Sequence, residues 1–239
     1  MTSNGAAGAL RAAGSVIADN HRRIREEIAA ACARVGRDPA EVTVVAVSKT
    51  VGLAEVARAV EGGIHDFGEN RSKPFNEKRT AFPDERWHFI GSIQTNKIKE
   101  FVGRAALVHS VASERALEGI ARRACLLGCV QRLLIEVNVS GEGSKDGATP
   151  ALLPLLLERA AELEGIEVAG LMTMAPQGDR AAAREAFASL RRLRDDRAAS
   201  LGPLERVPLR ELSMGMSEDY AIAVEEGATI VRIGRSMWA

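Results

Sequence analysis

Reactive side chains in this sequence stand directly after short apolar runs. Lys49 follows one such run, the β-branched segment 42–48. Burial of a lysine amine disfavours its charged form, and a neutral amine attacks aldehydes to form a Schiff base. Alternatively, the stem of Lys49 packs against the protein while its amine reaches water. The position of Lys49 alone leaves both interpretations open.

The last apolar run ends in residues that suit a phosphate group. The segment Arg232-Ile-Gly-Arg-Ser236 places a glycine and a hydroxyl residue at the end of the run. Gly234 would let a phosphate approach backbone N–H groups, and Ser236 could donate its hydroxyl hydrogen. A lysine and a phosphate cradle in one site suit a phosphorylated carbonyl compound, which could be a sugar phosphate or pyridoxal 5′-phosphate (PLP).

Two serines at the end of the preceding run could complete this cradle. Ser213 and Ser217 flank Gly215 and carry hydroxyl groups that can bind a phosphate. Turn formation and helix capping are their alternative roles, because Ser217-Glu-Asp-Tyr220 is a favourable start for a helix. Capping and phosphate binding both stay open for Ser217.

The apolar runs alternate with helical segments through most of the chain. Strands are expected at residues 42–48, 65–68, 87–91, 106–111, 132–139, 167–172, 209–214 and 229–234, and helices at 7–35, 53–60, 113–127, 150–163, 180–200 and 217–226. Strands that alternate with helices form parallel sheets through right-handed crossovers. Eight such units within about 200 residues predict an α/β fold, a single (β/α)8 TIM-type barrel with an extra N-terminal helix. The carboxyl ends of its strands would then meet at one rim.

An open, doubly wound sheet is the alternative architecture. It is disfavoured because no Gly-x-Gly-x-x-Gly segment follows the first expected strand. No low-complexity linker divides the chain, so residues 1–239 are expected to form one domain, with residues 1–7 as a flexible tail.

Composition argues against nucleic acid and membranes as partners. The chain has 32 basic and 32 acidic residues, and clusters such as Arg191 and Arg192 are interleaved with acids on what reads as a solvated helix face. No apolar run approaches the roughly 18 residues of a membrane span, and the start of the chain lacks a signal-peptide pattern. Three cysteines without metal-binding spacing suit a reducing compartment, so we expect a cytoplasmic protein with no metal site.

Eight blocks, in order, look like the pyridoxal phosphate homeostasis proteins, the YggS/PROSC family. They are Ala46-Val-Ser-Lys-Thr50, Phe67-Gly-Glu-Asn70, Trp87-His-Phe-Ile-Gly91, Gln94-Thr-Asn-Lys97, Asn138-Val-Ser140 with Ser144-Lys145 and Gly147, Gly170-Leu-Met-Thr-Met174, Leu212-Ser-Met-Gly-Met-Ser217 and Val231-Arg-Ile-Gly234. This resemblance covers roughly residues 10 to 239. It implies a barrel similar to the N-terminal domain of alanine racemase, with PLP as the cofactor.

The resemblance also implies roles for individual residues. It puts the Schiff-base lysine at Lys49, the partner of the pyridine nitrogen at Arg232, and the pocket wall beside the ring at Asn70 and His88. Phosphate contacts fall on the serines of the seventh strand, on Gly234 and on the following residue, which is Arg235 where the family often has a small hydroxyl residue. The full expected set of cofactor-binding residues is Lys49, Asn70, His88, Met172, Ser213, Ser217, Arg232, Gly234, Arg235 and Ser236.

Two functions remain as hypotheses. Arg232 cannot accept a proton, so a ring nitrogen beside it stays unprotonated and PLP becomes a weak electron sink. Racemisation also needs a second acid–base group, and the sole tyrosine, Tyr220, is expected to be structural within a helix. The weak electron sink alone does not exclude catalysis, since alanine racemase resembles this arrangement and is active. The missing second acid–base group and the missing second domain favour a monomeric PLP carrier that serves PLP-dependent apo-enzymes over a low-activity amino-acid racemase. A lysine-dependent aldolase acting on sugar phosphates is a third, weaker reading.

Overall fold

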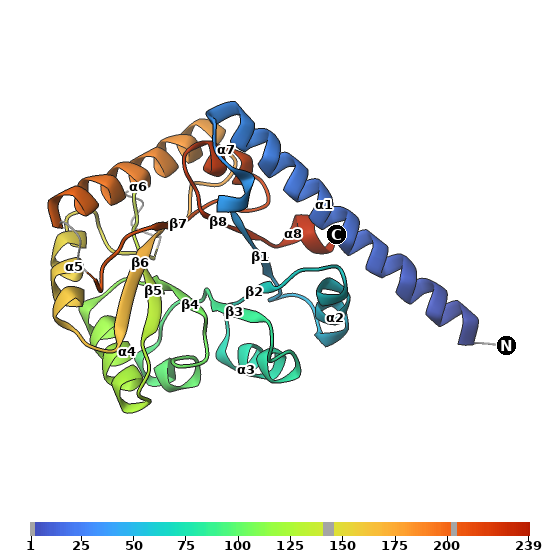
Figure 1. Ribbon diagram of the computed structural model, residues 1–239, viewed down its shortest axis with the longest axis horizontal. Helices are drawn as coiled ribbons and strands as arrows, with labels where there is room; N and C mark the ends of the chain where they lie inside the picture. Colours follow the sequence, from blue (N-terminus) through green and yellow to red (C-terminus); the bar gives the residue numbers. More distant parts are fainter. Residues whose placement is uncertain (1–2, 141–145, 202–204) are drawn as a thin grey trace.

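Eight parallel strands close into a barrel in chain order, with β8 pairing to β1. This confirms the (β/α)8 architecture that the alternating pattern predicts, and Figure 1 shows the strands surrounded by helices. The computed structural model describes residues 3–140, 146–201 and 205–239, and the side chains from residue 16 onward except that of residue 201. The expected tail at residues 1–7 falls largely outside the described side chains and stays a prediction.

The strand and helix bounds follow the expected order closely. The strands are β1 (Thr43–Val47), β2 (Asp66–Glu69), β3 (Arg86–Phe89), β4 (Leu107–Val111), β5 (Gln131–Glu136), β6 (Ile166–Met172), β7 (Glu211–Ser213) and β8 (Ile230–Ile233). The helical segments are α1 (Ser3–Val35), η1 (Pro39–Glu41), α2 (Leu53–Glu61), α3 (Ser72–Ala81), η2 (Thr95–Glu100), α4 (Glu114–Leu126), α5 (Leu153–Glu162), α6 (Arg180–Leu201), α7 (Tyr220–Glu225) and α8 (Arg235–Trp238).

Four helical segments, η1, α3, η2 and α8, were not expected from the sequence. Helix α3 contains Pro74 in its first turn, where proline is tolerated although it otherwise signals a break. Helix α7 begins three residues later than expected, at Tyr220. The late start matters for the site, because it leaves Ser217 in the loop that follows β7.

The long helix α1 packs on one side of the barrel, beside α7 and α8 (Figure 1). Ile17, Ile24, Ile28 and Cys32 are buried and lie at helical spacing, so one face of the helix joins the core. Tyr220 of α7 is also buried, and its hydroxyl donates to Glu27 at 2.5 Å. The structural role expected for Tyr220 is confirmed. No helix in the described part is long and apolar enough to cross a membrane.

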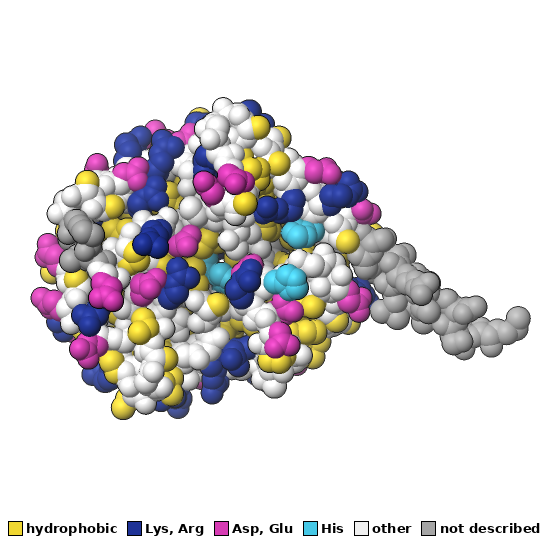
Figure 2. All heavy atoms as spheres, in the orientation of Figure 1, with side chains coloured by type: hydrophobic (Ala, Val, Ile, Leu, Met, Phe, Trp, Pro, Cys, Tyr) yellow, Lys and Arg dark blue, Asp and Glu magenta, His cyan; other side chains and the backbone are white. Residues whose placement is uncertain are grey.

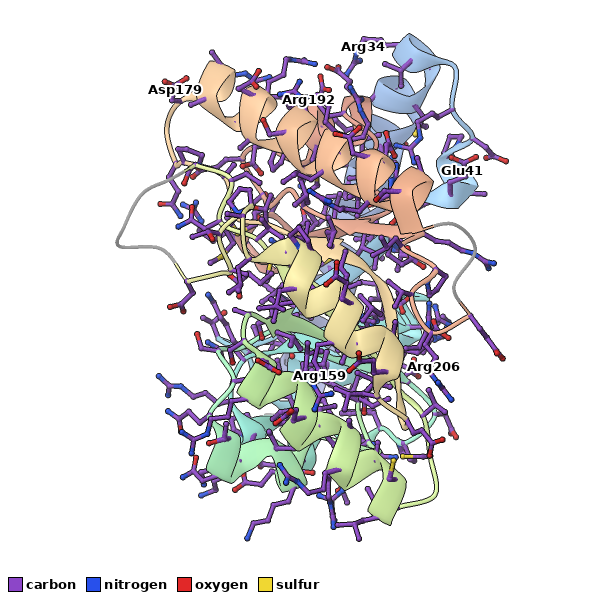
Figure 3. The ribbon with its side chains drawn as sticks, turned by 90° about the vertical axis from the view of Figure 1, so that its left-hand side faces the viewer. Arg34, Glu41, Arg159, Asp179, Arg192 and Arg206 are labelled. Atoms are coloured by element: carbon purple, nitrogen blue, oxygen red, sulfur yellow. The ribbon has the colours of Figure 1, made fainter. Side chains whose placement is uncertain are left out.

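The basic residues of α6 form the solvated face that the sequence predicts. Arg192 pairs with Glu185 at 2.6 Å and Arg191 with Glu226 at 3.2 Å. Figure 3 shows Arg192 on the outer side of this helix, and Figure 2 shows acidic and basic side chains interspersed over the visible face. Ion pairs at the surface each add less than about 1 kcal/mol to the free energy of unfolding, so they contribute to solubility more than to stability.

Two sets of side chains fill the interior. The larger set lies between strands and helices, where Phe67 stacks on Trp87 with ring centroids 5.1 Å apart. A smaller apolar set includes alternate strand residues such as Val45, Leu107 and Ile230, the pattern of inward-facing positions in a closed barrel. The inward-facing positions nearer the carboxyl ends of the strands are mostly polar, and they build the site.

Candidate functional site

A cavity of about 530 Å³ opens at the carboxyl ends of the strands. This is the rim on which barrel proteins assemble their binding groups. Seven residues of the expected set line it: Lys49, Asn70, Met172, Ser217, Arg232, Gly234 and Arg235. His88, Ser213 and Ser236 do not line it. Ser144 and Lys145, part of one resembling block, lie outside the described residues.

Lys49 lines the cavity, but its side chain is exposed. Of the two interpretations that the sequence left open for Lys49, the structure favours the one in which the amine reaches water. The last buried residue after β1 is Ser48, and a turn in which the Val51 N–H donates to the Ser48 carbonyl carries Lys49 outward. Lys49 has no hydrogen-bond or ion-pair partner among the described residues, so its amine is available to a ligand in the cavity.

The backbone beneath Lys49 is fixed by a buried cluster on neighbouring elements. Lys78 of α3 donates to the Ser48 carbonyl at 2.7 Å and pairs with the carboxylate of Glu69 at the end of β2. The Ser48 hydroxyl donates to the same carboxylate at 3.1 Å. From the other side, Trp238 donates its indole N–H to the Val47 carbonyl at 2.8 Å. These contacts hold the end of β1 and thereby the attachment point of Lys49.

The close packing of the second and third strand ends depends on a glycine. A Cβ built at Gly91 would lie 2.0 Å from the carbonyl oxygen of Asn70, so no larger residue fits without moving backbone. Both residues line the cavity. Asn70 therefore takes its expected place in the wall.

Gly234 stands at an open part of the cavity wall. A Cβ added there would meet only Val47, at 3.9 Å, so packing within the protein does not require glycine at this position. The free space lies on the cavity side, where a ligand oxygen can approach the backbone. This feature fits the expected phosphate cradle.

The Ser217 hydroxyl faces the same segment and does not cap α7, the helix that follows it in the chain. It accepts the backbone N–H of Ser236 at 3.3 Å, which ties the loop after β7 to the start of α8. Helix α7 is preceded instead by Asp219, whose carboxylate accepts the Met216 N–H at 2.6 Å. Capping by Ser217, which the sequence left open, was therefore wrong. Ser217 stays available to a cavity ligand.

Arg235 and Ser236 present backbone rather than side chains to this region. The Arg235 side chain is exposed and pairs with Glu218. Ser236 does not line the cavity, so a direct contact from its hydroxyl is not supported by its position. Phosphate binding by this segment stays a prediction, with its backbone N–H groups as the expected donors.

Arg232 is the buried cation of the cavity. Its residue is 5% exposed, and its guanidinium donates to the Ser213 hydroxyl at 2.6 Å and to the Thr173 carbonyl at 2.9 Å. Burial lowers the pKa of Arg232 to about 10, although the negative charges of Glu136 and Asp219 act to raise it. The guanidinium therefore stays charged at neutral pH. An arginine has five N–H donors, and those not used within the protein can face a ligand.

Two expected contact residues, Ser213 and His88, lie beneath the cavity instead. Ser213 is fully buried and bonds Arg232, so the arginine separates it from the ligand space. His88 is buried in the barrel between His109 and Asp66. Both side chains point into the barrel from strand positions one layer below the rim, which is why they miss the cavity.

Glu136 is a cavity residue that sequence reasoning missed. It ends β5 and is 4% exposed. Burial raises its pKa to about 7, with Arg232 opposing and Asp146 adding to the shift. A carboxylate inside the apolar run 132–139 was the available signal, since strand interiors bury charges only at a cost. No group of His, Cys, Asp or Glu within the described ranges could hold a metal ion.

The raised pKa of Glu136 predicts a pH-dependent stability. The folded carboxyl titrates near 7 and the unfolded one near 4.5, so the free energy of unfolding falls as pH rises between these values. We expect Glu136→Gln to raise that free energy by on the order of 2 kcal/mol at about pH 8, and much less at about pH 5. Denaturant unfolding at both pH values measures this. Glu77→Gln, at an exposed position of α3, is the control, and an equal gain at both pH values would contradict the assignment.

Comparison with known proteins agrees with this geometry. The model of the alanine racemase N-terminal domain matches residues 20–239. A pyridoxal phosphate homeostasis protein of Aquifex aeolicus is 42% identical over 215 residues, which cover 89% of this chain and 92% of the relative.

Solved structures extend the match to the whole barrel. A protein of Bifidobacterium adolescentis has a TM-score of 0.89 at 34% identity, covering 95% of this chain and 96% of its own. PipY of Synechococcus elongatus, solved with PLP bound, has a TM-score of 0.81 at 32% identity, covering 93% of this chain and 100% of PipY. The chain therefore belongs to the alanine racemase N-terminal domain family and, within it, to the pyridoxal phosphate homeostasis proteins.

Proposed function

We propose that this chain binds PLP as a Schiff base on Lys49 and serves intracellular PLP homeostasis as a carrier. The observation that carries the proposal is that one cavity unites an unpaired lysine, a buried arginine and an open glycine segment. These three features complement PLP, which has an aldehyde, a ring nitrogen and a phosphate. The PLP-bound structure of PipY and the name of the Aquifex aeolicus relative support the same cofactor.

The order of the strands fits the shape of the cofactor. The aldehyde and the phosphate arm sit on neighbouring ring carbons, and the nitrogen lies across the ring from the aldehyde. Lys49 and Gly234 follow β1 and β8, which pair with Ala46 opposite Ile233. Arg232 lies two residues before Gly234, on the inward side of β8. Lysine and phosphate cradle thus lie on adjacent strands, with the arginine deeper in the barrel.

The protein's own residues favour holding PLP over activating it. When bound, PLP supplies an electron sink that is strongest with a protonated ring nitrogen. Arg232 keeps its charge and can only donate, so it stabilises the unprotonated nitrogen. The Tyr220 hydroxyl donates to Glu27, and Tyr220 does not line the cavity. These features favour a carrier.

A low-activity amino-acid racemase is the second candidate, and Glu136 is the observation that favours it. Strands β1 and β5 stand on opposite sides of an eight-strand barrel, so Glu136 faces the cavity from across Lys49. A carboxyl with a pKa of about 7 can exchange protons near neutral pH. The carrier stays the preferred function because the similar proteins of Aquifex aeolicus and Pseudomonas aeruginosa are named pyridoxal phosphate homeostasis proteins.

The setting of this function is proposed on chemistry as well. Cys32, Cys125 and Cys129 are free thiols, which suits the cytoplasm. A carrier implies PLP-dependent apo-enzymes as recipients, and we propose that the protein acts as a monomer.

Replacement of the proposed Schiff-base residue is the first test. We expect Lys49→Ala to abolish the visible absorbance of the loaded protein while the fold is kept, because no other described lysine lines the cavity. Mass spectrometry after borohydride reduction should place the pyridoxyl adduct on Lys49. Lys97→Ala, at an exposed lysine paired with Glu100, is the matched control. An adduct found mainly on Lys97 or Lys145 would refute the assignment.

A second prediction compares two residues of the eighth strand end. Arg232→Ala should weaken PLP retention by about 1.5–3 kcal/mol, the worth of a hydrogen bond to a charged group. Ser236→Ala should cost at most about 1 kcal/mol, because its hydroxyl does not line the cavity. Residual cofactor after dialysis gives the comparison. Equal retention in both variants would mean that Arg232 does not hold the ring.

The third prediction separates carrier from enzyme. We expect the loaded protein to convert single L-amino acids far more slowly than the 1–1000 per second of typical enzymes, while transferring its PLP to an apo-enzyme. Assays for the D-amino acid, the keto acid and the amine measure turnover. Rates above about one per second would reverse the assignment, and their loss in Glu136→Gln would identify the second acid–base group.

A further inference from the structure

A continuous chain of polar side chains runs through the barrel interior to Arg232. It starts at Asp66, the first residue of β2, and passes through side chains of β3, β4 and β7 to β8. The links are Asp66 to His88 at 3.2 Å, His88 to His109 at 2.9 Å, His109 to Ser213 at 2.9 Å, and Ser213 to Arg232 at 2.6 Å. All five residues are less than a tenth exposed. The chain therefore connects the floor of the barrel with the cavity at its mouth.

The lower end of the chain is a carboxylate that can only accept. Burial alone would raise the pKa of Asp66, but hydrogen bonds from His88 and Arg86 lower it overall, so the group is ionised. Arg86 donates its Nε–H to Asp66 at 2.7 Å. The His88 nitrogen that faces Asp66, Nε2, must therefore carry a hydrogen.

With His88 in its neutral form, this constraint sets the direction of every other bond. A neutral His88 with hydrogen on Nε2 presents a bare Nδ1, which accepts from Nε2–H of His109. His109 then presents a bare Nδ1, which accepts the hydroxyl hydrogen of Ser213. Ser213 is left with lone pairs toward Arg232, whose N–H donates to it. Donors and acceptors match at each step.

The electrostatics of His109 agree with this arrangement. Burial, reinforced by the positive charge of Arg232, holds the pKa of His109 well below its usual value. A neutral imidazole has one donor and one acceptor nitrogen, which is what the chain requires at this position. If the hydrogen bonds ran in the opposite direction, the hydroxyl hydrogen of Ser213 would have no acceptor in the chain. A bare nitrogen of His88 would also face the Asp66 carboxylate.

We propose that Asp66, His88, His109 and Ser213 are positioning residues that orient the guanidinium of Arg232 toward the cofactor ring. The inference rests on the proposed function, because the ring of PLP is the group that Arg232 would meet. With Ser213 and Thr173 fixing two nitrogens of the guanidinium, the plane of the group is determined and its remaining donors point to the cavity. A pair of imidazoles in a barrel core gains little stability over apolar packing, so orientation is the better reason for the chain.

The direction of the chain can be measured without cofactor. Nitrogen-15 NMR of the imidazoles in the cofactor-free protein should show His88 and His109 neutral, each with its hydrogen on Nε2. A charged imidazole, or hydrogen on Nδ1 of either residue, would overturn the proposal. Because PLP is absent, this result stands apart from the fate of the proposed function.

Coupling to Arg232 is tested by a double-mutant cycle with PLP as the probe. Ser213→Ala should raise the Kd for PLP about 10-fold in the natural protein and less than about 2-fold in the Arg232→Gln background, because its effect passes through Arg232. His109→Phe, a ring of similar size, should show the same dependence with a smaller effect. Equal losses in both backgrounds, or no loss in the natural one, would overturn the proposal.

Two controls separate positioning from folding. His65→Ala removes an exposed imidazole that pairs with Glu85 at 2.8 Å, outside the barrel interior, and should leave the Kd unchanged. Thermal unfolding identifies variants that lose the fold. If Ser213→Ala and His109→Phe both unfold, the NMR measurement on the natural protein still tests the proposal. If no variant or natural protein binds PLP while the imidazole hydrogens are found as expected, the proposed function fails and the direction of the chain remains.

Discussion

A guanidinium buried at the mouth of the barrel needs hydrogen-bond acceptors, and the arrangement of the polar residues beneath the cavity follows from this requirement. Arg232 donates to the Ser213 hydroxyl and the Thr173 carbonyl, and the negative charges of Glu136 and Asp219 favour its charged form. A buried charge without such partners would cost several kcal/mol. The partners of Arg232 connect to further buried polar residues of β2, β3, β4 and β7 in the barrel interior. The cation thereby gains one defined orientation beneath the cavity.

The lysine is positioned by a different device. Lys49 is exposed and unpaired within the described chain, whereas the residue before it is held by Lys78 and Glu69. A fixed attachment point with a free amine suits a group that must form and release a covalent bond with an incoming aldehyde. The backbone at Ser48 is thus held by hydrogen bonds below the cavity, whereas the Lys49 side chain at the rim has no partner among the described residues. This division agrees with reversible cofactor binding better than with a closed catalytic site.

Much of the fold and part of the site could be predicted from the sequence. Alternating strand and helix patterns gave the barrel, because buried parallel strands read as apolar runs. Ser213 and His88 were misplaced because their partners are distant in sequence: His109 lies 104 residues from Ser213 and 21 from His88. Glu136 was passed over because its pKa depends on burial that one strand does not reveal. The exposure of Lys49 depends on a turn that follows β1 without a glycine or proline at its tip.

We propose that Arg232 donates to an unprotonated ring nitrogen of bound PLP. Nitrogen-15 NMR of the protein loaded with PLP labelled at that nitrogen tests it most directly. We predict the signal of an unprotonated, hydrogen-bonded pyridine nitrogen, which changes when Arg232 is replaced by glutamine. A protonated pyridinium signal, or a signal that Arg232→Gln leaves unchanged, would contradict the account.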